Sequence, residues 1–213
     1  MTERSNIVSI EEEKGVIHLA RSKEFDTNLV LHKAMEVFGH YGYEGTSMHL
    51  LLDGLGIARQ SLYDTYGTKR DLFLKATKHY VDEKSSAVVA YLAETTPVKR
   101  AIKDIFAVIG DTLRDEQRRK ECFILYSAID QVPHDPEIAE LFEQDKIRLE
   151  EALYEALVRG QQQGEFSPNR DMRALARYLY HSRYGLTQVA KLTDDPLVIE
   201  QITAITLSVL EQG

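Results

Sequence analysis

The stretch GIARQSLYDTYGTKRDLF, residues 56–73, decides the fold of this chain. Two glycines bracket a short segment that begins with the polar residues Arg59, Gln60 and Ser61. Glycine readily adopts the positive φ that ends one helix and opens a turn. Together with the preceding segment SMHLLLDGLG, residues 47–56, the stretch predicts two short helices joined by a tight turn. This is the helix-turn-helix arrangement, in which the second helix enters the major groove of DNA.

The same region is basic, although the chain as a whole is acidic. The 213 residues carry a formal net charge of −8, and residues 94–213 hold 15 basic and 21 acidic side chains. Residues 59–79 hold a net charge of +3, from Arg59, Lys69, Arg70, Lys75 and Lys78 against Asp64 and Asp71. The overall charge argues against a general nucleic-acid binder. A basic patch on an acidic body is typical of site-specific DNA binding, because phosphate attraction then acts at one surface only.

Helical periodicity runs through the whole chain. Apolar residues make up 43% and charged residues 28%, as in an ordinary globular protein. Apolar side chains recur every three or four residues, no segment alternates with a period of two, and all five prolines fall where the periodicity breaks. The fold class is therefore all-α, with about nine helices. We expect three short helices within 26–67, a long fourth helix over 68–93, and later helices over 97–116, 121–131, 136–163, 171–192 and 195–211.

This layout divides the chain into three parts. Residues 1–25 show little patterned apolarity, which predicts a flexible N-terminal arm. Residues 26–93 form the predicted helix-turn-helix domain with its long connecting helix, and residues 94–213 form a helical bundle. The single cysteine, Cys122, excludes an internal disulfide and agrees with a reducing compartment. No apolar run is long enough for a membrane span or a secretion signal, so we expect a cytoplasmic protein.

Side chains on and around the third short helix, which follows the tight turn, have the chemistry to read DNA. Arg59 can donate two hydrogen bonds to a guanine edge, and Gln60 can pair with adenine. Tyr63 can offer its hydroxyl to a phosphate or its ring to a thymine methyl. Leu62 and Tyr66 should face inward and hold this helix on the first two. The predicted DNA-binding set, which includes phosphate contacts from neighbouring helix starts, is Thr46, Ser47, His49, Arg59, Gln60, Ser61, Tyr63, Thr65 and Lys69.

The segment FGHYGYEGTSMHLLLDGLGIARQSLYDTYGTKRDLF, residues 38–73, resembles the DNA-binding domain of the tetracycline-repressor (TetR) family of transcriptional regulators. The likeness covers about residues 27–75, and beyond them only the helical layout matches. Ala58 stands where a capping Ser or Thr is usual in the family, and Tyr66 stands where Phe is usual. The matching positions are Phe38, Gly42, Thr46, Gly56, Leu62, Tyr63, Tyr66 and Lys69.

The resemblance implies a sequence-specific DNA-binding transcriptional regulator that works as a homodimer. The last two helices would pack against their copy as a four-helix bundle. They would set two recognition helices about one DNA turn apart, on a palindromic operator of double-stranded DNA. Repression is usual for such proteins. The residues predicted for this dimer interface are Leu175, Leu179, Leu186, Ile202, Ile205 and Val209.

The resemblance also implies a small-molecule effector that binds between the fifth and eighth helices, moves the long fourth helix and releases the DNA. The predicted pocket residues are Phe106, Cys122, Phe123, Tyr126, Tyr154 and Tyr180, an aromatic set suited to a flat or apolar compound. Aromatic residues at helical spacing are packing residues more often than ligand contacts, so a purely structural role for them stays open. No cofactor and no metal ion are expected.

Other classes of protein compete with this interpretation. A helical adaptor without DNA binding would explain the acidic bundle, but it leaves Arg59, Tyr63 and Lys69 without a task. Cys122 follows three cations near a helix start, a setting that acidifies a thiol and would suit an electrophile or redox sensor; a buried, inert cysteine is the alternative. An enzyme is not expected, because the motifs G-x-S-x-G and H-E-x-x-H and the P-loop are missing from the sequence.

Overall fold

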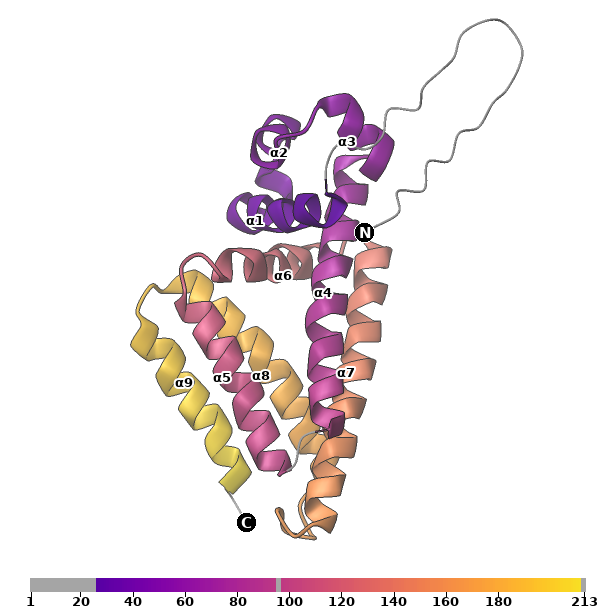
Figure 1. The fold of residues 1–213 in the computed structure, drawn as a ribbon. Helices are drawn as coiled ribbons and strands as arrows, with labels where there is room; N and C mark the ends of the chain where they lie inside the picture. Colours follow the sequence, from indigo (N-terminus) through magenta and orange to yellow (C-terminus); the bar gives the residue numbers. More distant parts are fainter. Residues whose placement is uncertain (1–25, 95–96, 212–213) are drawn as a thin grey trace, which may run out of the picture.

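The computed structural model describes residues 26–94 and 97–211. In these ranges it contains nine α-helices, a short 3₁₀ helix and no strand, so the predicted all-α class is confirmed (Figure 1). None of the helices in the same ranges is long and apolar enough to cross a membrane. The predicted N-terminal arm, residues 1–25, lies outside the described residues. The elements are α1 (Thr27–Gly45), α2 (Met48–Leu55), α3 (Arg59–Tyr66), α4 (Lys69–Glu94), α5 (Val98–Arg114), α6 (Arg119–Gln131), α7 (Pro136–Gln162), α8 (Met172–Leu192), α9 (Pro196–Ser208) and η1 (Val209–Glu211).

Local sequence signals set the ends of the first helices. Asp26 caps α1, because its side chain accepts hydrogen bonds from the amides of Asn28 and Leu29. Gly42, at φ 72°, bends the end of α1, and Gly56, at φ 67°, ends α2 in the left-handed conformation. The turn between α2 and α3 is therefore the one that the sequence predicts.

The predicted bounds of the later helices agree with the structure to within a few residues. The last helix differs most. We expect it to extend over 195–211, but α9 ends at Ser208 and the next three residues form the 3₁₀ helix η1. Helix α6 begins at Arg119, two residues before the predicted start.

The first three helices form a head around a small apolar core. Leu51 and Leu55 of α2 and Leu62 of α3 are almost fully buried. Phe38 of α1 and Phe73 of α4 meet edge to face, with ring centroids 4.9 Å apart. The core therefore joins the head to the first turns of α4.

Helix α6 lies directly below α1 in Figure 1 and supports it. Gly39 of α1 allows a close approach, because a Cβ at this position would lie 2.6 Å from the carbonyl oxygen of Lys120 in α6. The buried hydroxyl of Ser127 donates to the carbonyl of Phe38 at 2.8 Å. The ammonium of Lys191, in α8, donates to the carbonyl of Gly39 at 2.8 Å. Backbone contacts in the middle of α1 thus tie the head to the bundle.

The long helix α4 runs from the head down the bundle, beside α7 (Figure 1). A buried hydrogen-bond network joins the two helices to α8. Asp145 of α7 is 2% exposed, and its carboxylate accepts hydrogen bonds from Ser85 of α4 and from Arg183 and Tyr184 of α8. The guanidinium balances the charge of the carboxylate, which is what a buried ion requires. A displacement of α4 would therefore break contacts with both neighbours.

We predict that Gly39→Ala weakens the packing of α1 against α6. Its Cβ would meet backbone, which cannot move aside as a flexible side chain can. We expect a loss of about 1–3 kcal/mol in the free energy of unfolding, measured by urea denaturation. Gly185→Ala in α8 is the matched control, because nothing lies within 4 Å of a Cβ there, and it should be neutral or gain up to about 1 kcal/mol. Equal losses for the two variants would contradict the prediction.

Candidate DNA-binding face and ligand cavity

Helix α3 turns one face to the protein and the opposite face to solvent. Leu62 and Tyr66 are buried, which confirms that they face inward. The hydroxyl of Tyr66 donates to the carbonyl of Thr27 at 3.0 Å, so the tyrosine that replaces phenylalanine here has a partner for its polar atom. Arg59 and Tyr63, one helical turn apart, are exposed, and Tyr63 keeps 42% of its surface in solvent. The outer face of α3 is therefore open to a partner.

Most cations of the basic region are paired within the protein. Arg59 is the one cation of the five that makes no ion pair or hydrogen bond with the residues that the structure describes. Lys69 binds two backbone carbonyls. The other three bind as follows: Arg70 to Asp135 at 2.7 Å and Glu137 at 3.0 Å, Lys75 to the carbonyl of Tyr66 at 3.0 Å, and Lys78 to Asp82 at 2.7 Å. The charge of +3 counted from the sequence thus overstates the charge that this surface offers to DNA.

Two of the predicted phosphate contacts hold the end of α1 instead. The ammonium of Lys69 donates to the carbonyls of Tyr43 at 2.9 Å and Thr46 at 3.1 Å. The side chain of Thr46 is buried, and its hydroxyl donates to the carbonyl of Gly42. These carbonyls lie at or just after the bent end of α1, and the two side chains supply hydrogen bonds to them. In this arrangement the hydroxyl of Thr46 is already donated, which leaves the adjacent helix-end amides for a phosphate, and Lys69 keeps one of its three donors.

The other members of the predicted DNA-binding set lie near the surface of α2 and α3. His49 and Gln60 are exposed, and each binds an aspartate one helical turn later, Asp53 at 3.1 Å and Asp64 at 2.7 Å. These aspartates fix how the two side chains are presented. Ser47 is exposed at the N-cap of α2, while Ser61 and Thr65 are half-buried on α3.

The start of α3 has no side-chain cap. Ala58 occupies the N-cap position, and among the described residues no side chain caps the first amides of the helix. Uncapped amides at the partly positive end of a helix are a ready site for phosphate oxygens. The start of α3 therefore combines these amides with the exposed guanidinium of Arg59.

A cavity of about 700 Å³ lies in the bundle and borders α4. Its mainly apolar lining comes from α4, α5, α6, α7 and α8, and it includes Phe106, Cys122 and Tyr180 of the predicted pocket set. Small-molecule sites are typically clefts of about 300–1,000 Å³ with a few polar groups. In size and lining, the cavity suits a small apolar ligand.

The other three predicted pocket residues, Phe123, Tyr126 and Tyr154, do not line this cavity. Successive residues of a helix differ by about 100° in direction, so Phe123 leaves the cavity face of α6 that Cys122 occupies. The ammonium of Lys191 lies 4.6 Å from the ring centroid of Phe123 and 5.8 Å from that of Tyr126. The guanidinium of Arg173 lies 3.6 Å from the ring centroid of Tyr154.

The thiol in the cavity wall is not acidified. Burial raises the pKa of Cys122, although the sequence places three cations just before it. Two of these cations are bound elsewhere, Arg119 to Asp194 at 2.6 Å and Lys120 to Gln117 at 2.8 Å. The structure therefore favours the buried, inert cysteine over the reactive sensor.

Tyrosine and arginine side chains are among the polar groups that line the cavity. Burial raises the pKa of Tyr180 and Tyr80, so both phenols are neutral donors at physiological pH. Arg183 also lines the cavity, and its terminal nitrogen binds Asp145 at 2.7 Å. Its Nε is buried without a hydrogen-bond partner in the described part of the chain. A buried donor without a partner costs about 1–3 kcal/mol, a cost that the ion pair with Asp145 offsets in part.

Three of the predicted dimer-interface residues are buried inside the protomer. Leu175, Leu179 and Leu186 of α8 face its own core, and Leu179 also lines the cavity. Within the protomer α8 contacts α5, α6, α7 and α9, so these leucines have almost no exposed surface for a second copy. Of the remaining three, Ile202 and Ile205 are exposed on α9, and Val209 is half-buried.

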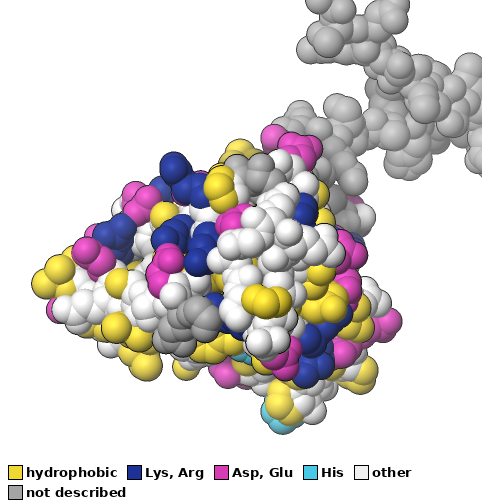
Figure 2. All heavy atoms as spheres, turned by 90° about the horizontal axis from the view of Figure 1, so that it is seen from below, with side chains coloured by type: hydrophobic (Ala, Val, Ile, Leu, Met, Phe, Trp, Pro, Cys, Tyr) yellow, Lys and Arg dark blue, Asp and Glu magenta, His cyan; other side chains and the backbone are white. Residues whose placement is uncertain are grey.

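Exposed apolar side chains gather on α9 and on the chain leading to it. They are Leu192 (81% exposed), Leu197, Ile202 and Ile205 (71% exposed). Figure 2 views the bundle from its lower end and shows apolar side chains at the edge on the side of α9, with charges of both signs interspersed elsewhere. Large apolar side chains gathered at one surface are typical of a protein interface.

Comparison with known proteins identifies relatives of both parts of the chain. Residues 30–76 match the family model for bacterial regulatory proteins of the tetR family, and residues 102–212 match that for the C-terminal part of BetI-type transcriptional repressors. The HTH-type transcriptional regulator YezE of Bacillus subtilis is 54% identical over 194 residues, 91% of this chain and 100% of YezE. The HTH-type transcriptional repressor ComR of Escherichia coli is 29% identical over 188 residues, 88% of this chain and 90% of ComR.

Solved structures agree with this assignment at the level of the fold. The TetR family transcriptional regulator CifR, as a cysteine mutant complexed with 26-base-pair operator DNA, superposes with a TM-score of 0.76 at 22% identity. The match covers 88% of this chain and 98% of that chain. With the helix-turn-helix inside the first matched segment and a 54% identical relative over nearly the whole length, the chain belongs to the tetR family of bacterial regulatory proteins and is a DNA-binding transcriptional regulator.

Proposed function

We propose that this regulator is a repressor that binds a palindromic operator as a homodimer and leaves it when an apolar effector binds the cavity. Residues 26–93 would read the DNA, and residues 94–213 would bind the effector and form the dimer. The observation that carries the proposal is the outer face of α3, where Arg59 is unpaired and Tyr63 is exposed beside an uncapped helix start. Such a protein would work in the cytoplasm, where its operator lies, and no enzymatic step is part of the proposal.

Each group on this face has a distinct task in the proposed complex. Arg59 would donate two hydrogen bonds to a guanine edge in the major groove, while the amides at the start of α3 would hold a phosphate. Gln60 gives one N–H to Asp64 and keeps its carbonyl oxygen and second N–H for an adenine edge. Tyr63 would donate its hydroxyl to a phosphate. Specificity would rest on Arg59 and Gln60, and affinity on the backbone contacts.

We predict that Arg59→Ala lowers affinity for the operator by about 10- to 100-fold and relaxes preference for the operator sequence. The operator can be obtained by selecting bound fragments from the source genome, and affinity can be measured by fluorescence anisotropy at several salt concentrations. Lys78→Ala is the matched control. This cation belongs to the same basic stretch but is paired with Asp82, so its removal should leave affinity and salt dependence unchanged. Equal affinities of wild type and Arg59→Ala would show that Arg59 does not contact the operator.

The position of the cavity supports effector control. Tyr80, Val88 and Tyr91 of α4 line it, and the first turn of α4 carries Lys69, which holds the end of α1. A ligand that fills the cavity would therefore press on the helix that connects it to the head. The mainly apolar lining suits an apolar compound.

We predict that Ile109→Trp, which puts a large ring into the cavity from α5, weakens binding of an apolar fluorescent probe such as anilinonaphthalene sulfonate by at least about tenfold. Ile147→Trp on α7 is the control, because Ile147 is 60% exposed and lies outside the cavity lining. The readout is a fluorescence titration of each variant. Unchanged probe affinity in Ile109→Trp would show that the apolar probe binds outside the cavity and would contradict the proposed effector site.

The proposed dimer uses the exposed apolar side chains at α9. A two-fold contact brings the same patch of both protomers together, so Leu197, Ile202 and Ile205 would each meet apolar surface of the copy. The interface would then be centred on α9, and α8 would take part through side chains other than its buried leucines.

We predict that Ile205→Asp converts the dimer into a monomer, because the two-fold contact would bury a carboxylate from each protomer in an apolar surface. Sedimentation velocity measures the result. Ile147→Asp places the same charge on a similarly exposed isoleucine away from α9 and should stay dimeric. If Ile205→Asp remained dimeric, the dimer interface could not be centred on α9.

A further inference from the structure

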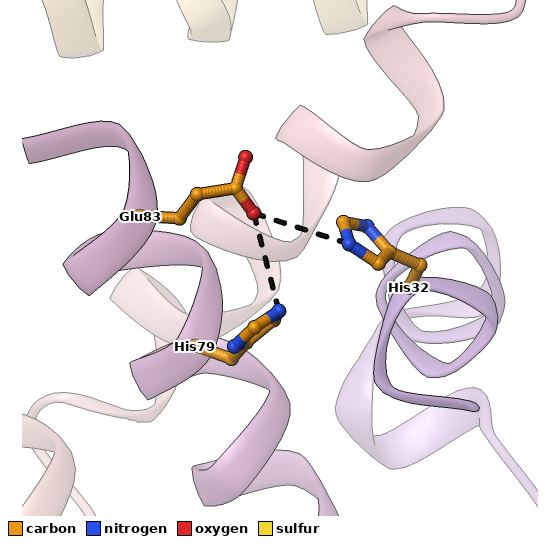
Figure 3. Close-up of side chains that lie close together, drawn as sticks. All are labelled: His32, His79 and Glu83. Carbon is orange, nitrogen blue, oxygen red and sulfur yellow. Dashed lines mark ion pairs between the residues drawn. The ribbon is translucent and has the colours of Figure 1, made fainter. Parts of the chain in front are cut away.

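A cluster of metal-ligating side chains lies where α1 crosses α4, away from the outer face of α3. Figure 3 shows His32 of α1 with His79 and Glu83 of α4 turned toward one point between the two helices. The Nε2 atoms of both imidazoles lie 3.9 Å from the same carboxylate oxygen, Oε2 of Glu83. One potential ligand atom from each residue falls within 4.8 Å of the others.

The two helices supply the ligands in different ways. His79 and Glu83 are four residues apart, so α4 alone presents them on one face. His32 comes from a helix that packs across this face, and its ring meets that of His79 edge to face at 5.4 Å between centroids. The cluster therefore exists only when the head and α4 are docked together.

Neighbouring side chains orient the cluster. The carboxylate of Glu121, in α6, accepts a hydrogen bond from Nδ1 of His32 at 3.1 Å. A neutral imidazole that donates through Nδ1 has its lone pair on Nε2, the atom that faces Glu83. Lys84 donates to Oε1 of Glu83 at 2.9 Å, which leaves Oε2 for the histidines.

The Nε2 atom of His79 is buried beside the other two ligands. It has no hydrogen-bond partner among the described residues. The 3.9 Å to Glu83 is too long for a hydrogen bond. A buried nitrogen of this kind costs free energy unless something binds it, and the nitrogen points to the centre of the cluster.

We propose that His32, His79 and Glu83 bind a divalent transition-metal ion of the Zn²⁺ class, with water completing the coordination. Two imidazoles and one carboxylate are a ligand set that Zn²⁺ accepts, with bonds of about 2.0–2.2 Å. In a tetrahedral site such bonds put ligand atoms about 3.4 Å apart, so the two 3.9 Å separations would close by about 0.5 Å. Glu121 accepts the hydrogen bond from Nδ1 of His32 and so orients this histidine for metal binding through Nε2.

The metal would fasten the DNA-reading head to the helix that borders the cavity. His32 belongs to α1, whereas Lys84 and Glu121, the two groups that orient the ligands, both line the cavity. An effector that moves Lys84 or Glu121 would therefore disturb the metal ligands, and the metal would restrain the same side chains.

Titration of the tag-free, chelator-treated full-length protein with Co²⁺ tests the site, followed by displacement with Zn²⁺. We expect one equivalent of Co²⁺ to give the intense visible absorption of tetrahedral coordination, and Zn²⁺ to remove it. His79→Gln and Glu83→Gln should each weaken binding by about 100-fold or more, and Glu121→Gln by about 10- to 100-fold. His181→Gln is the matched control, because this exposed histidine of α8 lies 3.7 Å from Glu150 but belongs to no cluster of three metal-ligating side chains among the described residues, and it should bind as the wild type does.

A second readout separates loss of the site from loss of the fold. Zn²⁺ should raise the melting temperature of the wild type and of His181→Gln, since a ligand that binds only the folded state stabilises it. It should leave that of Glu83→Gln unchanged. Glu83 is exposed, so this variant is expected to fold. Binding in Glu83→Gln and His79→Gln within twofold of the wild type, or equal loss in His181→Gln, would overturn the proposal.

Discussion

The close packing of α1 against α6 is the constraint that sets the direction of α3, the recognition helix. Helix α3 contacts the rest of the protein through the core that it shares with α1, α2 and the start of α4, so it points where α1 places it. Gly39 brings the backbones of α1 and α6 into contact, and Ser127 and Lys191 bond carbonyls in the middle of α1. Packed backbones shift between discrete arrangements rather than deform continuously, so a change in the bundle would turn the head as a unit.

The partners of the cations in residues 59–79 depend on the tertiary fold and could not be predicted from the sequence. Counting cations predicts a basic surface, but Lys69 and Lys75 satisfy carbonyls at helix ends, and Arg70 joins α4 to the start of α7. These lysines and this arginine hold the DNA-binding surface in shape, whereas Arg59 presents its charge to solvent. Helix ends and charge partners lie far apart along the chain, up to 67 residues for Arg70 and Glu137, so spacing could not indicate which cations would remain unpaired.

The fold and the inner face of α3 were predictable because their signals are local. Glycines, capping residues and apolar spacing fix the helices, and Leu62 and Tyr66 follow from the direction of a short helix. The cavity and dimer residues depend on how whole helices rotate against one another. Phe106 lines the cavity while Tyr154 lies under Arg173, and Leu179 faces inward, although all three satisfy the same apolar pattern. The pair His79 and Glu83 carries a weak local signal, but His32 lies 47 positions earlier and only the tertiary fold brings it there.

The cavity and the histidine cluster meet on the same stretch of α4, which gives a physical basis for communication between effector and DNA. From Tyr80 to Tyr91 this helix lines the cavity, Ser85 binds the buried Asp145, and Glu83 faces α1. A rotation of α4 that made room for a ligand would change its contacts with both α7 and α1. Because coupling between two sites is reciprocal, DNA that holds α1 in place would disfavour the same rotation, and a coupling of about 1–3 kcal/mol would shift effector affinity by about 5- to 150-fold.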